Sequence, residues 1–365
     1  SKNEYLGTSI AVADMNGDSF DDILLGTPRA SVMLEGKLQK NVGSIQILSG
    51  ANGTLLNTLY GTAAKQYFGT AIAVVADQNS DGVPDLVIGS PAALKGMGNV
   101  SLHSGADGTL IDPIADGSNA GEKFGAAVAV GDVDNDGNAD LVVGAPGANV
   151  VVTDIVTLKT KTLKKAGKVV VFDSISNAVL YTHEGSQAGA AFGASVAVNK
   201  ADHQLLVGSP LFDVLTKPRL SSAGRVDIFN GTDDTNVALL TVDGDSAKAL
   251  LGASVSSFSG DIDGDTEADW VAGMPGAKVE VLVSGKPKLM SNQGKVAIYS
   301  GVISVLPTQI LEGSNPKEKF GFAVNAEGDL QNDSVNDLVI GAPEFVDPVN
   351  KKLGKLGRIE VLDSF

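Results

Sequence analysis

The chain has 365 residues, 43% of them hydrophobic, and its 43 Asp and Glu outnumber its 27 Lys and Arg, so the formal net charge is −16. This acidity argues against a nucleic-acid-binding protein, and the absence of Cys excludes disulfides and thiolate metal sites. No run of 18 or more apolar residues occurs, so we expect no membrane-spanning helix. No signal peptide is visible, so an exported protein would be represented here in a mature or trimmed form.

Two short motifs alternate along the chain without a break. An aromatic residue or Leu followed by Gly occurs at residues 6–7, 68–69, 124–125, 192–193, 251–252 and 320–321. Gly-x-Pro occurs at residues 26–28, 89–91, 144–146, 208–210, 273–275 and 341–343. A period of roughly 60 residues predicts six copies of one structural unit. We place the repeats approximately at 5–61, 67–117, 124–185, 192–244, 250–313 and 320–365.

Each repeat has the pattern of four short strands, named A to D here. Strand A follows the first motif, strand B ends in Gly-x-Pro, and strand C starts at a Gly, as in GKVVVFDS at 167–174. Alternating apolar residues bounded by Gly, Asn and Asp are typical of strands. We therefore predict one all-β domain, residues 1–365, folded as a β-propeller of six four-stranded blades. The alternative is a seven-bladed ring with one incomplete blade, because the last repeat stops after its strand C.

The A–B connections carry oxygen-bearing residues at alternating positions. Repeat 3 has Asp132, Asp134, Asp136 and Asp140 at positions 1, 3, 5 and 9, and the backbone carbonyl of Asn138 at position 7. Four other repeats have the same spacing, again with a backbone carbonyl at position 7: Asp14, Asn16, Asp18, Phe20 and Asp22; Asp77, Asn79, Asp81, Val83 and Asp85; Asp261, Asp263, Asp265, Glu267 and Asp269; and Asp329, Gln331, Asp333, Val335 and Asp337.

This spacing predicts calcium sites. Alternate positions of a tight loop converge on one point, and Ca²⁺ takes six to eight oxygen ligands at about 2.3–2.6 Å, whereas Mg²⁺ demands a stricter octahedron. Asp and Asn also form ordinary turns, but five such loops at one place in a repeat favour bound metal. About five Ca²⁺ would bring the formal charge from −16 to about −6. The repeat 4 loop, residues 199–204, is short and contains a Lys, so we predict no ion there.

Phe-Gly, an Asp-rich loop and Gly-Ala-Pro together form the FG-GAP motif, and Gly144-Ala145-Pro146 and Gly341-Ala342-Pro343 match it without substitution. The chain resembles the propeller of integrin α subunits over nearly its whole length. The resemblance implies that the Asp-rich loops lie at one end and that the B–C and D–A connections form the opposite, ligand-facing end. Six repeats instead of seven, and the absence of Cys, indicate a non-animal relative, for which pairing with a β subunit does not follow.

Basic residues concentrate in the long B–C connections. These connections alternate like projecting hairpins in repeats 3 and 5. A basic end opposite the acidic loops would attract acidic partners, although lysines on hairpin edges also simply block aggregation. The residues that we expect on this ligand-facing end are Lys159, Lys161, Lys164, Lys165, Lys286, Lys288, Lys351 and Lys352.

The function that these features favour is an extracellular or cell-surface adhesion or ligand-binding module that is not an enzyme, with structural Ca²⁺. Its partner would be a protein or an anionic glycan, and further domains can be missing from this chain. Two alternatives stay open: an enzyme acting on polysaccharide, which would need a basic side chain gathered with a metal in one cleft, and a purely structural surface domain.

Overall fold

The computed structural model describes residues 6–154, 156–173, 176–232, 235–258, 268–283, 286–301, 304–328, 330, 336–347, 349 and 357–362. These residues form an almost pure β-structure, in which the helical conformation is limited to the short segment α1 (Ala93–Gly96). No helix in this part of the chain has the length and hydrophobicity needed to cross a membrane.

Six antiparallel sheets follow one another along the sequence, with their strands in the order A-B-C-D. Blade 1 consists of β1 (Ile10–Ala13), β2 (Asp22–Thr27), β5 (Ser44–Leu48) and β6 (Leu55–Tyr60), and blade 2 of β7 (Ala71–Val75), β8 (Asp85–Ser90), β9 (Asn99–His103) and β10 (Leu110–Asp116). Blade 3 consists of β11 (Ala127–Gly131), β12 (Asp140–Ala145), β15 (Lys168–Phe172) and β16 (Val179–Glu184), and blade 4 of β17 (Ser195–Asn199), β18 (Gln204–Gly208), β19 (Arg225–Asn230) and β20 (Leu240–Asp243). Blade 5 consists of β21 (Ser254–Ser257), β22 (Trp270–Met274), β25 (Lys295–Tyr299) and β26 (Gln309–Glu312), and blade 6 of β27 (Ala323–Gly328), β28 (Asp337–Ala342) and β29 (Arg358–Leu362).

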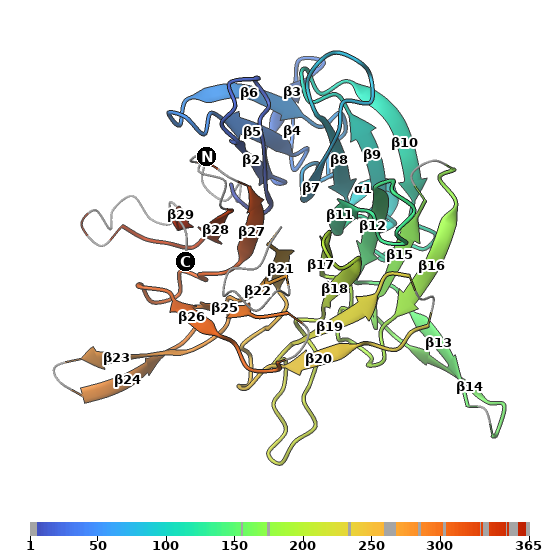
Figure 1. Cartoon of the computed structure of the whole chain (residues 1–365), viewed down its shortest axis with the longest axis vertical. Helices are drawn as coiled ribbons and strands as arrows, with labels where there is room; N and C mark the ends of the chain where they lie inside the picture. Colours follow the sequence, from blue (N-terminus) through green and yellow to red (C-terminus); the bar gives the residue numbers. More distant parts are fainter. Residues whose placement is uncertain are drawn as a thin grey trace.

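The blades surround one axis as a β-propeller (Figure 1). The first strand of each blade lies innermost, and each of these strands contacts its neighbours around the ring, including β27 of the last blade with β1 of the first. The predicted six-bladed propeller is therefore confirmed, and the seven-bladed alternative is wrong. Blade 6 has three strands among the described residues, as expected from a last repeat that stops after strand C.

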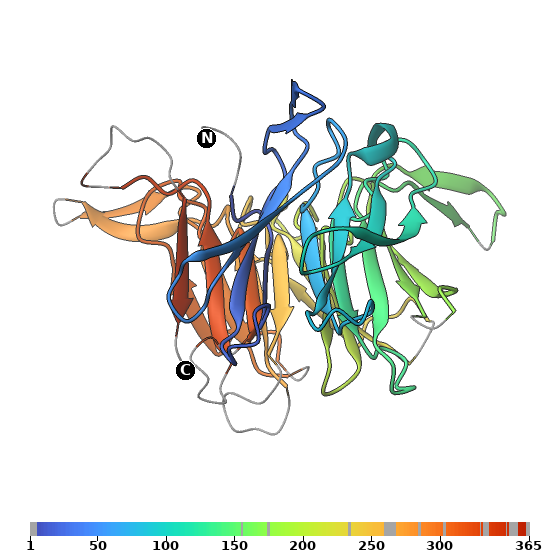
Figure 2. The ribbon, with the colours of Figure 1, turned by 90° about the horizontal axis from the view of Figure 1, so that it is seen from above.

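Within the described residues, three two-stranded hairpins extend from the B–C connections of alternate blades. They lie toward the end of the propeller that is uppermost in Figure 2. The hairpins pair β3 (Val32–Leu34) with β4 (Lys37–Gln39), β13 (Val150–Thr153) with β14 (Thr160–Leu163), and β23 (Val279–Val283) with β24 (Lys286–Met290).

Backbone hydrogen bonds show which connections share an end. The amide of Gly147, after strand B of blade 3, donates to the carbonyl of Glu122 in a D–A connection at 3.0 Å, and Lys248 and Ser221 are joined in the same way at 2.9 Å. At the other end, Gly231 after strand C donates to His203 in an A–B connection at 2.9 Å. The B–C and D–A connections therefore share one end, and the A–B and C–D connections share the other.

The hydrophobic core lies between the blades. Each junction buries one cluster of aliphatic and aromatic side chains, because both faces of a central strand are covered by neighbouring blades. The aromatic residue of the first motif takes part: Phe68, Phe124, Phe192 and Phe320 are at most 3% exposed. Each forms a parallel bridge with the Gly that precedes strand C of the preceding blade. The motif thus joins consecutive blades.

Candidate metal centres

In blades 1 and 2, the first Asp of the A–B loop folds the loop around its own carboxylate. In blade 2, Asp77 Oδ1 accepts the backbone N–H groups of Asn79, Ser80 and Asp81, and Oδ2 accepts that of Gly82 at 2.8 Å. Asp14 makes the equivalent bonds in blade 1. These bonds replace the ladder at the end of the hairpin, so a short side chain with two acceptor oxygens is needed at position 1.

The last Asp of each loop is buried; it starts strand B in blades 1, 2, 3 and 6 and directly precedes it in blade 5. Asp22, Asp85, Asp140, Asp269 and Asp337 are at most 2% exposed. In blades 1, 2, 3 and 6, its Oδ2 accepts the backbone N–H of position 2, at 2.6–3.0 Å. A buried carboxylate is costly without compensating donors or a cation, so position 9 is a strong candidate for metal coordination.

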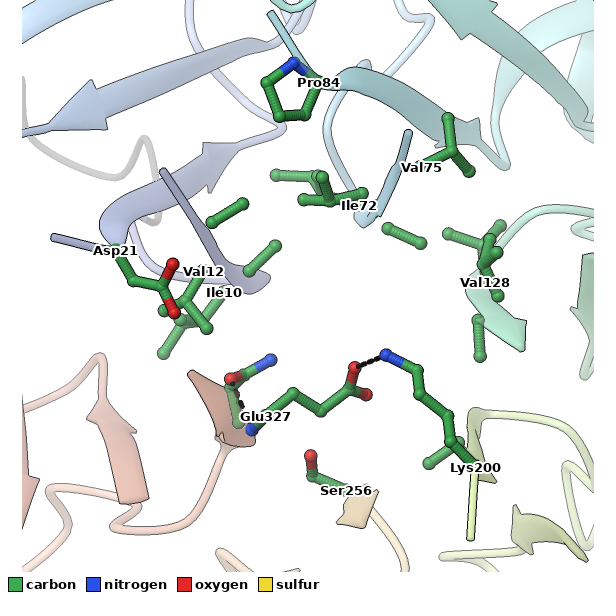
Figure 3. Close-up of a pocket in the computed structure, with 18 of the residues that line it drawn as sticks. Ile10, Val12, Asp21, Ile72, Val75, Pro84, Val128, Lys200, Ser256 and Glu327 are labelled. Atoms are coloured by element: carbon green, nitrogen blue, oxygen red, sulfur yellow. Dashed lines mark hydrogen bonds and ion pairs between the residues drawn. The ribbon is translucent and has the colours of Figure 1, made fainter. Parts of the chain in front are cut away.

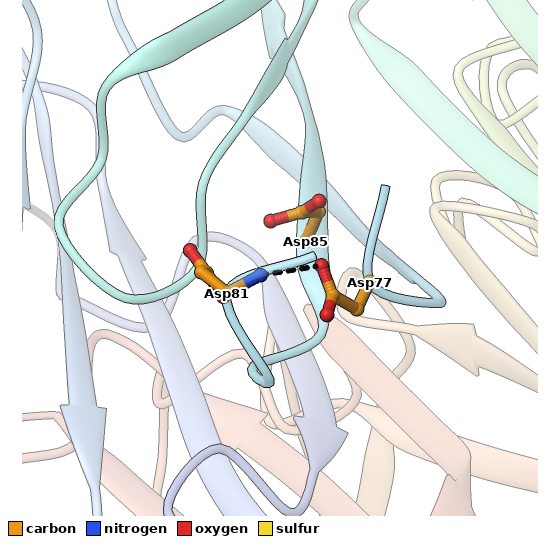
Figure 4. A group of neighbouring side chains, drawn as sticks. All are labelled: Asp77, Asp81 and Asp85. Atoms are coloured by element: carbon orange, nitrogen blue, oxygen red, sulfur yellow. Dashed lines mark hydrogen bonds between the residues drawn. The ribbon is translucent and has the colours of Figure 1, made fainter. Parts of the chain in front are cut away.

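In blades 2 and 3 the structure brings three carboxylates of one loop together. Asp77, Asp81 and Asp85 have oxygens that all lie within 4.8 Å of one another, and they point to a common space (Figure 4). Asp132, Asp134 and Asp136 form a similar group in blade 3. Ligand oxygens around Ca²⁺ stand at such separations. In the part of the chain that the structure describes, Asp14, Asp18 and Asp22 of blade 1 are not brought within this distance.

Mutual repulsion affects the titration of these groups. Burial raises the pKa of Asp22, and the charges of Asp18 and Asp14 add to this effect. Burial likewise raises the pKa of Asp140, with contributions from Asp134 and Asp136. A divalent cation would relieve this repulsion. The donor set and the crowding of negative charge therefore fit calcium.

The remaining loops are only partly covered. The predicted ligands Asp261, Asp263, Asp265 and Glu267 of blade 5, and Asp329, Gln331, Asp333 and Val335 of blade 6, lie outside the described residues. In blade 4, β17 and β18 are joined by a short hairpin in which Asn199 Nδ2 donates to Asp202 Oδ2 at 3.0 Å. His203 Nδ1 of this hairpin lies 2.7 Å from the backbone oxygen of Asp132, so the hairpin supports the blade 3 loop.

At the opposite end, the predicted lysines fall into two groups. Lys159, Lys161, Lys164, Lys165, Lys286 and Lys288 are exposed on or beside the β13–β14 and β23–β24 hairpins, whereas Lys351 and Lys352 lie outside the described residues. Basic residues at the start of strand C are instead ion-paired: Lys168 with Glu122, Arg225 with Asp243 and Lys295 with Glu312. The exposed lysines of the hairpins thus keep positive charge without an ion-pair partner among the described residues.

The central channel holds a cavity of about 420 Å³ near the A–B loops (Figure 3). Aliphatic side chains of the innermost strands form its wall. Lys200 Nζ reaches across to Glu327 Oε2 at 2.7 Å and so joins blade 4 to blade 6. The lysine of the degenerate fourth loop, whose presence argued against metal there, therefore has a partner of its own.

Sequence reasoning missed two residues. Asp173 follows strand C of blade 3, yet its carboxylate joins those of Asp134 and Asp140 within 4.8 Å. Lys37 belongs to a third hairpin, where it is exposed opposite Leu34. Both could have been found by aligning the repeats, because Asp173 takes the place of Ser49 and Ser104, and Lys37 takes that of Lys161 and Lys288.

Comparison with known proteins finds matches to FG-GAP repeats and to integrin α subunits. The FG-GAP repeat model matches residues 6–48 and 124–172, and an FG-GAP-like repeat model matches residues 77–143. Integrin alpha-8 of Gallus gallus is 29% identical over 48% of this chain, integrin alpha-V of the same species 34% over 40%, and integrin alpha-IIb of Homo sapiens 32% over 48%. The matched segments span 14–18% of the length of these relatives. The chain therefore contains FG-GAP repeats and is similar in sequence to part of the integrin α subunits.

Proposed function

We propose that the chain is a non-catalytic adhesion or ligand-binding module of the cell surface or extracellular space, with calcium in its A–B loops and its ligand on the opposite end. The observation that carries the proposal is the separation of the two ends: carboxylate groups lie in the A–B loops, and unpaired lysines lie on the B–C hairpins. Similarity to integrin α subunits supports the choice of an adhesion module.

Calcium would be held by the loops named above, with carboxylate oxygens at positions 1, 5 and 9, a side-chain oxygen at position 3 and a backbone carbonyl at position 7. About five ions is the number that the sequence supports. Their role would be structural, because each loop joins two strands of one blade and bound metal stabilises the folded state by mass action.

The ligand end has a repeated construction. In each of the three hairpins a lysine stands directly opposite an apolar residue: Lys37 faces Leu34, Lys161 faces Val152 and Lys288 faces Val281. Large apolar side chains are exposed near these lysines, among them Met33, Val156 and Leu282 at 62%, 86% and 75%. Exposed apolar groups flanked by positive charge favour an acidic protein surface or an anionic glycan as the partner.

The test is a binding screen on protein and glycan arrays with the calcium-loaded chain, followed by two triple variants. The charge-reversed variant is K37E/K161E/K288E and the matched control is K37R/K161R/K288R, which keeps the charge. We expect a ligand that the wild type and the control retain and the reversed variant loses. Equal binding by all three proteins would show that the hairpin lysines do not contact the ligand. Hydrolysis of an arrayed glycan would favour the enzyme alternative.

A further inference from the structure

Blade 3 differs from blades 1 and 2 at the residue that follows strand C. This residue is Ser49 in blade 1 and Ser104 in blade 2, but Asp173 in blade 3. Ser104 Oγ donates to Asp81 Oδ2 at 2.9 Å, so the position faces the A–B loop of its own blade. Asp173 therefore brings an additional carboxylate to the loop.

The blade 3 carboxylates form two overlapping groups. One contains Asp132, Asp134 and Asp136, and the other contains Asp134, Asp140 and Asp173, with ligand oxygens within 4.8 Å in each. Asp140 groups with Asp173 and not with Asp132 and Asp136. A single Ca²⁺ would leave three of these five negative charges uncompensated, whereas two ions would leave one.

An independent observation indicates a missing partner in the second group. Asp140 is 1% exposed, and its Oδ2 accepts the N–H groups of Val133 and Asp134 at 3.0 and 3.4 Å. Its Oδ1 has no hydrogen-bond partner among the residues that the structure describes. In blades 1 and 2 the corresponding oxygen accepts the backbone N–H of Gly50 and Gly105. Because a buried oxygen without a partner is destabilising, the blade 3 arrangement calls for a cation at this point.

We propose that blade 3 binds a second divalent cation, coordinated by Asp134, Asp140 and Asp173, beside the cation of Asp132, Asp134 and Asp136. The inference rests on the proposed calcium binding by the A–B loops. Asp134 belongs to both groups and would be a ligand of both ions. The C–D turn of blade 3 is thereby tied to its A–B loop by metal, where blade 2 uses the Ser104 hydrogen bond.

The experiment counts Ca²⁺ by calorimetric titration of the metal-stripped full chain. D173N keeps the Oδ1 acceptor that Ser176 N–H and Oγ use at 2.6 Å, and D173S introduces the residue of blades 1 and 2. The matched control is D116N, an exposed carboxylate in strand D of blade 2. We expect D173N and D173S to bind one Ca²⁺ fewer than the wild type, and D116N to bind the full number. An unchanged number in both D173N and D173S overturns the proposal.

Terbium luminescence gives a local readout. Tyr181 lies near the second group: burial raises its pKa and the charges of Asp140 and Asp134 contribute, while its hydroxyl donates to the carbonyl of Gly231 at 2.7 Å. Tb³⁺ in the second group should be sensitised by Tyr181, so both Y181F and D173N should lose that part of the emission. Loss in Y181F with full emission in D173N would contradict the second ion. A wild type that takes up no metal at all would instead refute the calcium loops themselves.

Discussion

Gly144 of blade 3 has no room for a side chain, because a Cβ there would stand 2.1 Å from the carbonyl oxygen of Gly193 in the next repeat. The Gly of Gly-x-Pro thus meets the Gly of the first motif across a blade junction. The same pair recurs at four other junctions, where the distance from such a Cβ to the carbonyl oxygen is 1.9–2.1 Å. At the junction of blades 6 and 1, a Cβ on Gly341 would stand 3.5 Å from the carbonyl oxygen of Gly7.

The ring is therefore less tightly joined between its last and first blades. Leu6, in the aromatic position of repeat 1, is 45% exposed, while its counterparts are buried. The core cluster at this junction contains five buried residues among those described, against at least ten at each of the others. Closure of the ring therefore depends on the other contacts between β1 and β27.

Matched glycine substitutions should separate the two kinds of junction. We expect G144A to lower the free energy of unfolding by about 2 kcal/mol or more, because the new methyl group overlaps backbone atoms that cannot move independently. G341A should change it by less than about 1 kcal/mol, since its Cβ would meet only ordinary contacts at 3.5 Å. Chemical denaturation measures both, and equal losses would show that the last junction is as tight as the others.

Asp81→Asn should weaken the calcium site of blade 2 by removing the negative charge of one ligand, with little change in the metal-free protein. Asp81 is exposed, and the loop already accommodates Asn at position 79. We expect loss of up to about 2.7 kcal/mol of calcium-dependent stabilisation when free Ca²⁺ is about 100 times the dissociation constant. Thermal melts with calcium and with EGTA measure this. D107N, on the adjacent C–D turn, is the control, and an equal effect of D107N would show that D81N acts only through charge.

Asp227 should make the stability of blade 4 depend on pH. It is 9% exposed and accepts a hydrogen bond from Thr241 Oγ1 at 2.8 Å, and burial raises its pKa above 3.8. Its contribution to stability is therefore fully present below pH 3.8 and is lost as the pH rises through the folded-state pKa. D227N should gain stability relative to the wild type from about pH 4 toward neutrality. A difference that does not vary with pH would contradict this assignment.

The ion pair across the channel should contribute little. Lys200 and Glu327 are 53% and 34% exposed, so solvent screens their attraction. We expect a coupling free energy below about 1 kcal/mol from a double-mutant cycle of K200M and E327Q. A coupling free energy above about 2 kcal/mol would show that this ion pair is a major contribution to the stability of the ring.

The repeat pattern alone predicts much of this architecture. The two motifs give six blades because the same local contacts recur at the five junctions between consecutive repeats. The Asp spacing predicts the loops of blades 2 and 3, whose carboxylates converge. Asp173 was missed because its approach to Asp140 depends on how the C–D turn packs on the A–B loop. The pairing of Lys168 with Glu122, which neutralises a lysine at the start of strand C, likewise depends on how a D–A connection packs against that strand. Such contacts are set by tertiary packing and not by local sequence.

The metal content of the purified chain, measured by mass spectrometry and paired with thermal melts in calcium and in excess EGTA, decides whether the Asp-rich loops are structural calcium sites. We predict about five or six Ca²⁺ per chain, the sixth being the second ion of blade 3, and a large fall in melting temperature on chelation. Little bound calcium and an unchanged melting temperature would contradict the assignment of the Asp-rich loops as structural calcium sites.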